Sequence, residues 1–303
     1  MHLGNGIICP VTGIPMILAS SLAAIYAFKK ARMEDLSKDR IILIATLTSF
    51  VFALQMINFA IPSTGSSGHI VGGVLLATLL GANTGFLAIC VIFLVQALFF
   101  ADGGILAIGC NIFNMGFLAC YVAYPLIFKP FAKKNMPFIG AIIASIVALQ
   151  AGSLAIVIEG VLSGSIKLLN SGNFALMMQL IHLPIGLVEG IVTGGVVAIA
   201  KQVSQKSLYF AFGAVSFILA CIISKYASSK PDGLEWSLLN ISDSFIIQSK
   251  YTLYSIIESI QTKIAVLSSI QPVIANFYGL VILYITMFGL CKMLSFFKEV
   301  NEC

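Results

Sequence analysis

Nine apolar stretches follow one another along the chain, separated by short polar or glycine-rich breaks. They cover residues 11–28, 41–60, 70–81, 85–101, 104–128, 137–160, 174–200, 207–223 and 274–291. Most approach the length of about 20 residues that a helix needs to cross a bilayer, and none alternates strictly as outer-membrane strands do. The pattern predicts an all-α integral membrane protein, a polytopic helical bundle of about seven helices followed by a C-terminal two-helix hairpin.

The stretch from 70 to 101 allows two interpretations. The sequence LLGANTGFL at 79–87 interrupts it with glycine and asparagine, which are typical of a turn. The part before this break is short for a full crossing. The segment is therefore either one span with a preceding half-helix or two spans.

Composition supports a membrane protein, because 59% of the 303 residues are hydrophobic and only 10% are charged, against about 25% charged in soluble domains. The net charge is +5, but Lys and Arg are scattered over the loops without a basic run, so we expect no nucleic-acid partner. With the N-terminus outside, 12 of the 17 Lys and Arg fall in cytoplasmic loops. We predict a multi-pass protein of the cytoplasmic membrane, in contact with the lipid bilayer, with its C-terminus in the cytoplasm.

One long polar segment, 224–273, separates the last two apolar stretches and contains PDGLEWSLL. We therefore divide the chain into a membrane unit, 1–206, and an appended hairpin, 207–303, whose external loop is 224–273. The start, MHLGNGIICP, has neither the basic region nor the apolar core of a signal peptide. We expect the mature chain to begin at Met1.

Two of the three histidines stand at positions that suit a metal. A free α-amine, the amide nitrogen of residue 2 and the Nδ1 of His2 can chelate one ion through fused five- and six-membered rings. Such in-plane nitrogens favour Ni(II) or Cu(II), with Co(II) possible. His69, in the flexible loop STGSSGH, is predicted on the same outer side and could supply a fourth nitrogen. Each histidine alone is also explained as incidental or solvated, and it is their combination that indicates a site.

Ionisable groups within membrane spans are costly, and are usually paired or functional. The sequence contains four candidates: Asp102, Glu159, His182 and Glu189. Asp102 and Glu159 are expected near the outer surface, where they are either exposed to water or attract cations. His182 and Glu189 share a helix face and are expected to form a polar clasp between helices rather than to bind metal directly. Five further side chains are expected to join helices or to orient the histidines: Gln55, Asn58, Ser67, Asn111 and Asn114.

The sequence contains no GxxxxGK[ST] phosphate loop and no Ser/His/Asp or Cys/His set with a plausible site, so we predict neither ATP hydrolysis nor an enzyme. Two other classes remain as alternatives. A self-sufficient secondary transporter or channel would use the four ionisable residues as an ion path. An intramembrane metalloenzyme would need a general base beside the metal, which the sequence does not offer.

Four segments together resemble one known family: MHLGNGIICP, LQMINFAIPSTGSSGH, VQALFFADGGILAIGCNIFNMG and HLPIGLVEGIVT. They are similar to the CbiM/NikM family, the substrate-capture (S) components of energy-coupling-factor importers for nickel and cobalt, over roughly 1–206. The PDGLEWSLL segment resembles the PDGLE domain, an accessory component, over about 207–303.

The resemblance implies a metal held by the amine of Met1, the amide and imidazole of His2, and the imidazole of His69. Ni(II) or Co(II) is then the transported substrate and not a cofactor, and the sequence does not decide between them. The resemblance also implies three partner subunits, a transmembrane coupling (T) protein and two cytoplasmic ATPases. All ligands are expected within 1–206, because the sequence offers no evident ligand beyond Glu189.

Overall fold

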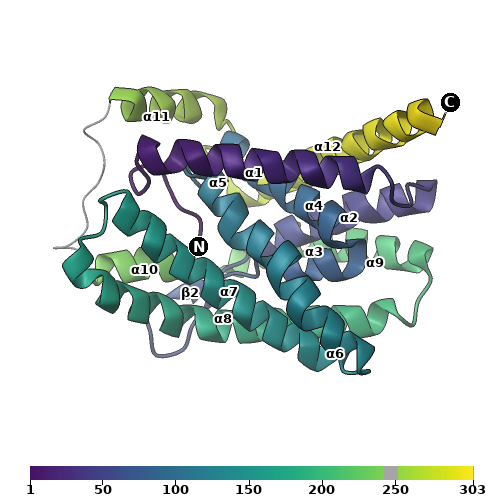
Figure 1. The fold of residues 1–303 in the computed structure, drawn as a ribbon, viewed down its shortest axis with the longest axis horizontal. Coiled ribbons are helices and arrows are strands. Elements are labelled where there is room, and N and C mark those ends of the chain that lie inside the picture. The colour runs from purple at the N-terminus through teal and green to yellow at the C-terminus, as the bar shows by residue number, and fades with distance from the viewer. Residues whose placement is uncertain (242–251, 303) are drawn as a thin grey trace.

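A computed structural model describes residues 1–241 and 252–302 of the chain (Figure 1), so that 242–251 of the expected external loop lie outside the described residues. The helices of the first unit are α1 (Pro10–Ala31), α2 (Lys38–Gln55), α3 (Gly73–Leu80), α4 (Ala82–Val95), α5 (Ile108–Asn111), α6 (Lys129–Lys133), α7 (Pro137–Leu162) and α8 (Ser171–Ala200). Those of the appended part are α9 (Gln205–Cys221), α10 (Gly233–Leu239), α11 (Thr252–Ile264) and α12 (Pro272–Glu302).

Shorter elements complete the fold. Wide π-helical turns extend α4 as η1 (Gln96–Phe100) and join α5 to α6 as η2 (Ile112–Phe128). Single 3₁₀ turns are η3 (Leu168–Asn170) and η4 (Ile223–Tyr226). The strands β1 (Phe59–Ala60) and β2 (Ser67–Gly68) pair antiparallel, with Phe59 opposite Gly68.

Six helical segments among the described residues are long and apolar enough to cross a membrane. They are Pro10–Ala31, Ala82–Phe100, Ile108–Lys133, Pro137–Leu162, Leu168–Ala200 and Pro272–Glu299. Helix α9 is apolar but shorter, and α2 lies almost wholly buried. The prediction of an all-α polytopic membrane protein is therefore confirmed.

Three predicted boundaries differ from the structure. Within 70–101, α3 has only 8 residues and ends at Gly81, whose φ of 92° stops the helix, so the span begins at Ala82. The stretch 41–60 leaves its helix at Gln55, because the chain turns there into β1. The stretch 104–128 becomes helical only at Ile108.

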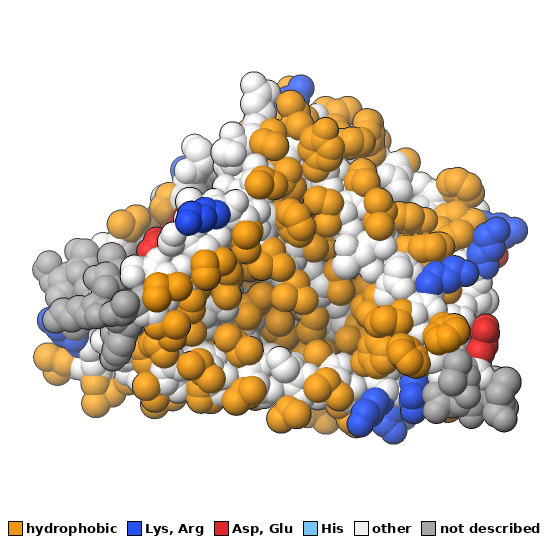
Figure 2. Space-filling model, turned by 90° about the horizontal axis from the view of Figure 1, so that it is seen from above, with side chains coloured by type: hydrophobic (Ala, Val, Ile, Leu, Met, Phe, Trp, Pro, Cys, Tyr) orange, Lys and Arg blue, Asp and Glu red, His pale blue; other side chains and the backbone are white. Residues whose placement is uncertain are grey.

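The helices α7 and α8 pack against each other along their lengths at one side of the molecule, and α1 lies at the other side beside α5 (Figure 1). Helix α2 packs against α9 and α12. Figure 2 shows a face on which hydrophobic side chains predominate, with most of the visible Lys and Arg toward its edges. This distribution is typical of a surface that faces lipid.

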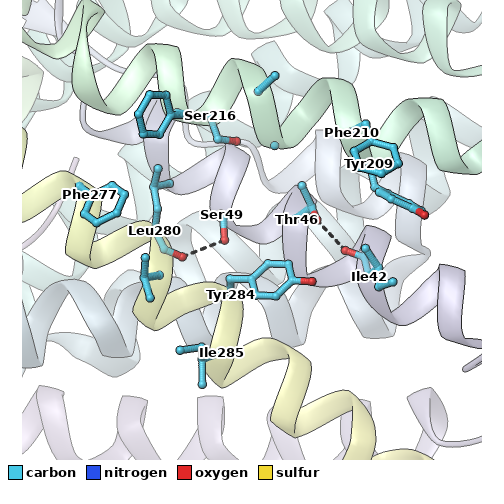
Figure 3. A pocket seen from close by; sticks show the side chains of 14 residues that line it. Ile42, Thr46, Ser49, Tyr209, Phe210, Ser216, Phe277, Leu280, Tyr284 and Ile285 are labelled. Atoms are coloured by element: carbon cyan, nitrogen blue, oxygen red, sulfur yellow. Dashed lines mark hydrogen bonds between the residues drawn. The ribbon is translucent and has the colours of Figure 1, made fainter.

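An open apolar groove of about 750 Å³ lies where α9 and α12 meet α2 (Figure 3). Two hydroxyls in its wall donate to main-chain carbonyls: Thr46 to Ile42 O at 2.8 Å and Ser49 to Leu280 O at 3.2 Å. The groove is an apolar surface between α2 and the appended hairpin.

Helices α1 and α5 cross at backbone contact. A Cβ atom on Gly109 would lie 2.2 Å from the nitrogen of Ile17 and 2.5 Å from the carbonyl oxygen of Met16. Ser20 fixes the crossing by donating to the carbonyl of Gly109 at 2.7 Å. Small residues allow such close approach between membrane helices.

We predict that Gly109→Ala separates α1 from α5 and lowers the stability of the protein by about 1–3 kcal/mol, the usual cost of overpacking. Gly195→Ala is the matched control, because a Cβ there meets nothing within 4 Å. Thermal unfolding in detergent measures both. Equal midpoints for the two variants would contradict the tight crossing.

Candidate metal centre

The first nine residues form a non-helical segment that runs into the bundle. The side chain of Asn111 holds the main chain of this segment. The N–H of Leu3 donates to Asn111 Oδ1 at 2.8 Å, and Asn111 Nδ2 donates to the carbonyl of Leu3 at 3.2 Å. Gly104 N–H donates to the same carbonyl at 2.8 Å. Met1 and Leu3 are buried. The terminus is thus held inside the protein.

His69 is positioned by the short hairpin that follows α2. It comes directly after β2 and is 6% exposed. Its Nδ1 lies 3.4 Å from the carbonyl oxygen of Ile70, which can only accept, so Nδ1 carries the hydrogen and Nε2 keeps its lone pair. A neutral imidazole with a free Nε2 is the form that binds a metal.

The structure brings the rings of His2 and His69 together. Their centroids are 5.2 Å apart and the rings are nearly parallel, at 11°, while Phe93 meets His2 edge-on at 5.2 Å. The rings are stacked, so an ion in the plane of both requires one of them to rotate. Of the predicted residues, Met1, His2 and His69 thus meet at one place.

Burial keeps both imidazoles neutral. The pKa of His2 is lowered to about 3, mainly by burial and next by the charge of the terminal amine, against the attraction of Asp232. Burial, the amine and His2 lower the pKa of His69 to about 3 in the same way. Because both values lie far below 7, the rings hold no proton that a metal would have to displace at neutral pH.

A carboxylate from the appended part also reaches this place. Asp232 Oδ2 accepts from the α-amine of Met1 at 2.8 Å, in an ion pair whose side chains are 16% and 3% exposed. Burial raises the pKa of Asp232, but the charge and hydrogen bond of the amine outweigh it and hold that pKa well below the usual range. A residue 231 positions away thus contacts Met1, so that the appended part borders the predicted ligands, all of which lie within 1–206.

The sequence contains a signal for Asp232 that lies outside the motifs of the predicted metal site. An Asp followed three residues later by Glu, just ahead of an apolar run, is typical of a helix start. In the structure Asp232 accepts from the N–H of Glu235 at 2.8 Å, and Glu235 accepts from the N–H of Asp232 at 3.2 Å. This reciprocal pair of hydrogen bonds, a capping box, fixes the carboxylate of Asp232 at the start of α10. Which group the carboxylate faces depends on the folded chain.

Ser67 links the histidine loop to the same segment. Its N–H donates to the carbonyl of Pro231 at 2.8 Å, and its hydroxyl donates to that of Lys230, also at 2.8 Å. Nearby, the N–H of Ser228 donates to the carbonyl of Asn58 at 2.7 Å. Ser67 therefore joins the histidine loop to the segment just before Asp232, and the main-chain carbonyl of Asn58 adds a further hydrogen bond to that segment.

Buried polar side chains hold the residues that follow His69. Gln55 donates to the carbonyl of Val71 at 2.7 Å, and Gln96 donates to Gln55 at 2.7 Å. Glu189 accepts from the N–H groups of Val71 and Gly72 at 2.8 and 3.2 Å. Gln55 and Glu189 thus both hold the main chain of the residues after His69.

The remaining candidates lie in separate contacts. Glu159 accepts from Asn114 at 2.7 Å, and His182 Nδ1 donates to the carbonyl of Met178 at 2.6 Å. Asp102 lies 3.5 Å from His2 Nδ1. Burial raises the pKa of Asp102, opposed by His69 and the amine.

A hollow of about 270 Å³ opens over the two histidines. Among the residues that line it are His2, His69 and the carboxylates of Asp102, Asp232 and Glu235. Within 1–241 and 252–302, no group of three or more His, Cys, Asp and Glu side chains is arranged to hold a metal ion.

Comparison with known proteins gives the family. The model of CbiM, the cobalt uptake substrate-specific transmembrane region, matches residues 2–207, and that of the PDGLE domain matches 206–295. A protein of Archaeoglobus fulgidus named as a putative fused nickel transport protein, NikMN, is 33% identical over 65% of this chain. The matched region spans 64% of the relative's length. The fused nickel transport protein NikMN of Rhodobacter capsulatus is 36% identical over 41% of this chain and 35% of its own.

The same fold is present in a solved structure, the crystal structure of a truncated transition metal transporter. It is 32% identical and superposes with a TM-score of 0.58 on 67% of this chain, covering 99% of its own. The family match spans both histidines and all the spans from α1 to α8. The chain therefore belongs to the CbiM/NikM family of nickel and cobalt transport membrane proteins, with a PDGLE domain fused behind it.

Proposed function

We propose that the protein is the high-affinity Ni(II)- or Co(II)-binding S component of an energy-coupling-factor importer in the cytoplasmic membrane. It captures the ion on the outer face through four nitrogens: the amine of Met1, the amide and Nδ1 of His2, and Nε2 of His69. The observation that carries this proposal is the docking of the chain terminus beside His69, with the two imidazole rings 5.2 Å apart.

The donor set explains the choice of metal. Nitrogen donors in one plane favour Ni(II) and Cu(II) over Mg(II) and Ca(II), which prefer oxygen. A deprotonated amide is a strong donor and suits a planar Ni(II) complex. The burial that keeps both imidazoles neutral supports tight binding at pH 7, because no imidazole proton competes with the ion.

The energy for import comes from partners in this proposal. The sequence contains no phosphate-binding loop, and a transmembrane coupling protein with two cytoplasmic ATPases would supply ATP hydrolysis. The N-terminus outside and the C-terminus in the cytoplasm follow from the distribution of Lys and Arg. The four ionisable residues first considered for an ion path lie in separate contacts, which favours a binding subunit over a secondary carrier.

We predict that blocking the terminal amine abolishes metal binding. Acetylation of Met1, or a Gly-Gly-Gly extension ahead of it, removes the free amine from the five-membered ring while leaving every side chain in place. Isothermal titration with nickel should show affinity falling by at least about a hundredfold, since one ring of the chelate is lost. An acetylated chain that binds as tightly as the free one would remove the amine from the ligand set.

We also predict that His69→Ala weakens nickel binding by at least about tenfold, because it removes one of four nitrogen donors and little packed apolar volume. Asn58→Ala is the matched control, since Asn58 lines the same hollow but supplies no nitrogen to the proposed set. Titration of both variants, with thermal unfolding to verify the fold, separates the role of a metal ligand from that of a residue that only lines the hollow. Equal affinities for the two variants would exclude His69 as a ligand.

A further inference from the structure

We propose that Asp232 is a positioning residue for metal capture: its carboxylate holds the terminal amine in place, so that the nitrogens of Met1 and His2 stand ready beside His69. The PDGLE domain is then part of the metal site and not only an accessory hairpin. This inference rests on the proposed function, because it concerns the amine that the metal would bind.

The first support is the way the carboxylate is held. One oxygen accepts from the amine at 2.8 Å and the other from the N–H of Glu235 at 2.8 Å. The second contact lies at the first turn of α10, where the helix dipole favours a negative charge. Asp232 is therefore fixed by its own helix, independently of the terminus.

The second support is the link between Asp232 and the histidine loop. Asp232 forms a parallel bridge with Ser67, whose N–H and hydroxyl donate to the two residues before Asp232. His69 lies two residues after Ser67. The same short segment thus fixes two of the proposed ligand groups, the amine directly and His69 through its neighbour.

The third support is close packing beneath the segment. A Cβ atom on Gly233 would lie 2.6 Å from the side chain of Ile181 and 3.0 Å from the ring of His182. A larger residue would lift the start of α10 away from α8. The glycine after Asp232 therefore lets the carboxylate reach the terminus.

The physical reason for such a residue is the cost of burying a charge. An ammonium taken out of water without a partner is strongly unfavourable, and Met1 is 4% exposed. Without Asp232, moving the charged amine from the site into water would lower the free energy of the protein. Asp102, the other carboxylate beside the histidines, lies against His2 Nδ1.

The test compares Asp232→Asn with Glu258→Gln, a control that removes an exposed carboxylate from α11 of the same domain. In the full-length metal-free protein at fixed pH, an amine-reactive ester should acylate Met1 at least about tenfold faster in Asp232→Asn, because a partly buried ion pair is lost. The control should react at the wild-type rate. Equal acylation rates for Asp232→Asn and wild type would overturn the proposal.

The second readout is the kinetics of nickel binding. The chain has one tryptophan, Trp236, one turn after Asp232, so quenching of its fluorescence by nickel reports binding. We expect slower association in Asp232→Asn with little change in dissociation, and partial rescue in Asp232→Glu, which keeps the charge. A purely structural role would give no rescue, and that result would also overturn the proposal.

The acetylated wild-type protein distinguishes this inference from the proposed function. If acetylation leaves nickel binding intact, the four-nitrogen site itself is wrong. If acetylation abolishes binding while Asp232→Asn captures nickel at the wild-type rate, the site stands and only the role of Asp232 fails.

Discussion

The partly buried ion pair between the α-amine of Met1 and Asp232 is the interaction on which the arrangement of the site depends. A charged chain terminus normally stays in water, because taking it into a protein interior costs several kcal/mol unless a counter-charge receives it. Here the amine forms an ion pair with the carboxylate of Asp232, and the side chain of Asn111 pairs with both main-chain groups of Leu3. These contacts make a flexible end of the chain into a fixed part of the bundle.

The same interaction joins the two family regions. The CbiM match ends at residue 207 and the PDGLE match begins at 206, yet the start of α10 contacts Met1, Ser67 and His182. Two residues after His69, Gln55 and Glu189 hold the main chain of Val71. A site assembled from such distant segments is rigid only when all of them are in place, which is the physical basis for assigning the PDGLE domain a part in metal capture.

The sequence predicts much of this arrangement but not all of it. Hydropathy locates the helices, and Gly81 predicts the break between α3 and α4, because these features are local. Loop charges predict that His2 and His69 lie on one side of the membrane, and the structure brings their rings to 5.2 Å from each other. The partner of Asp232 lies 231 residues away, and no local pattern specifies such a contact. The pairing of Glu189 with the N–H groups of Val71 and Gly72 is likewise set by how α8 packs against the loop.

In the proposed site one metal ion is held in a plane by nitrogens that include the chain terminus. X-ray absorption spectroscopy of the nickel-loaded protein, prepared with its native Met1, tests this most directly. We expect a planar, four-coordinate Ni(II) with short metal–ligand bonds, the geometry typical of tetragonal nitrogen donors. A six-coordinate Ni(II) with the longer bonds of an octahedral site would contradict the planar site.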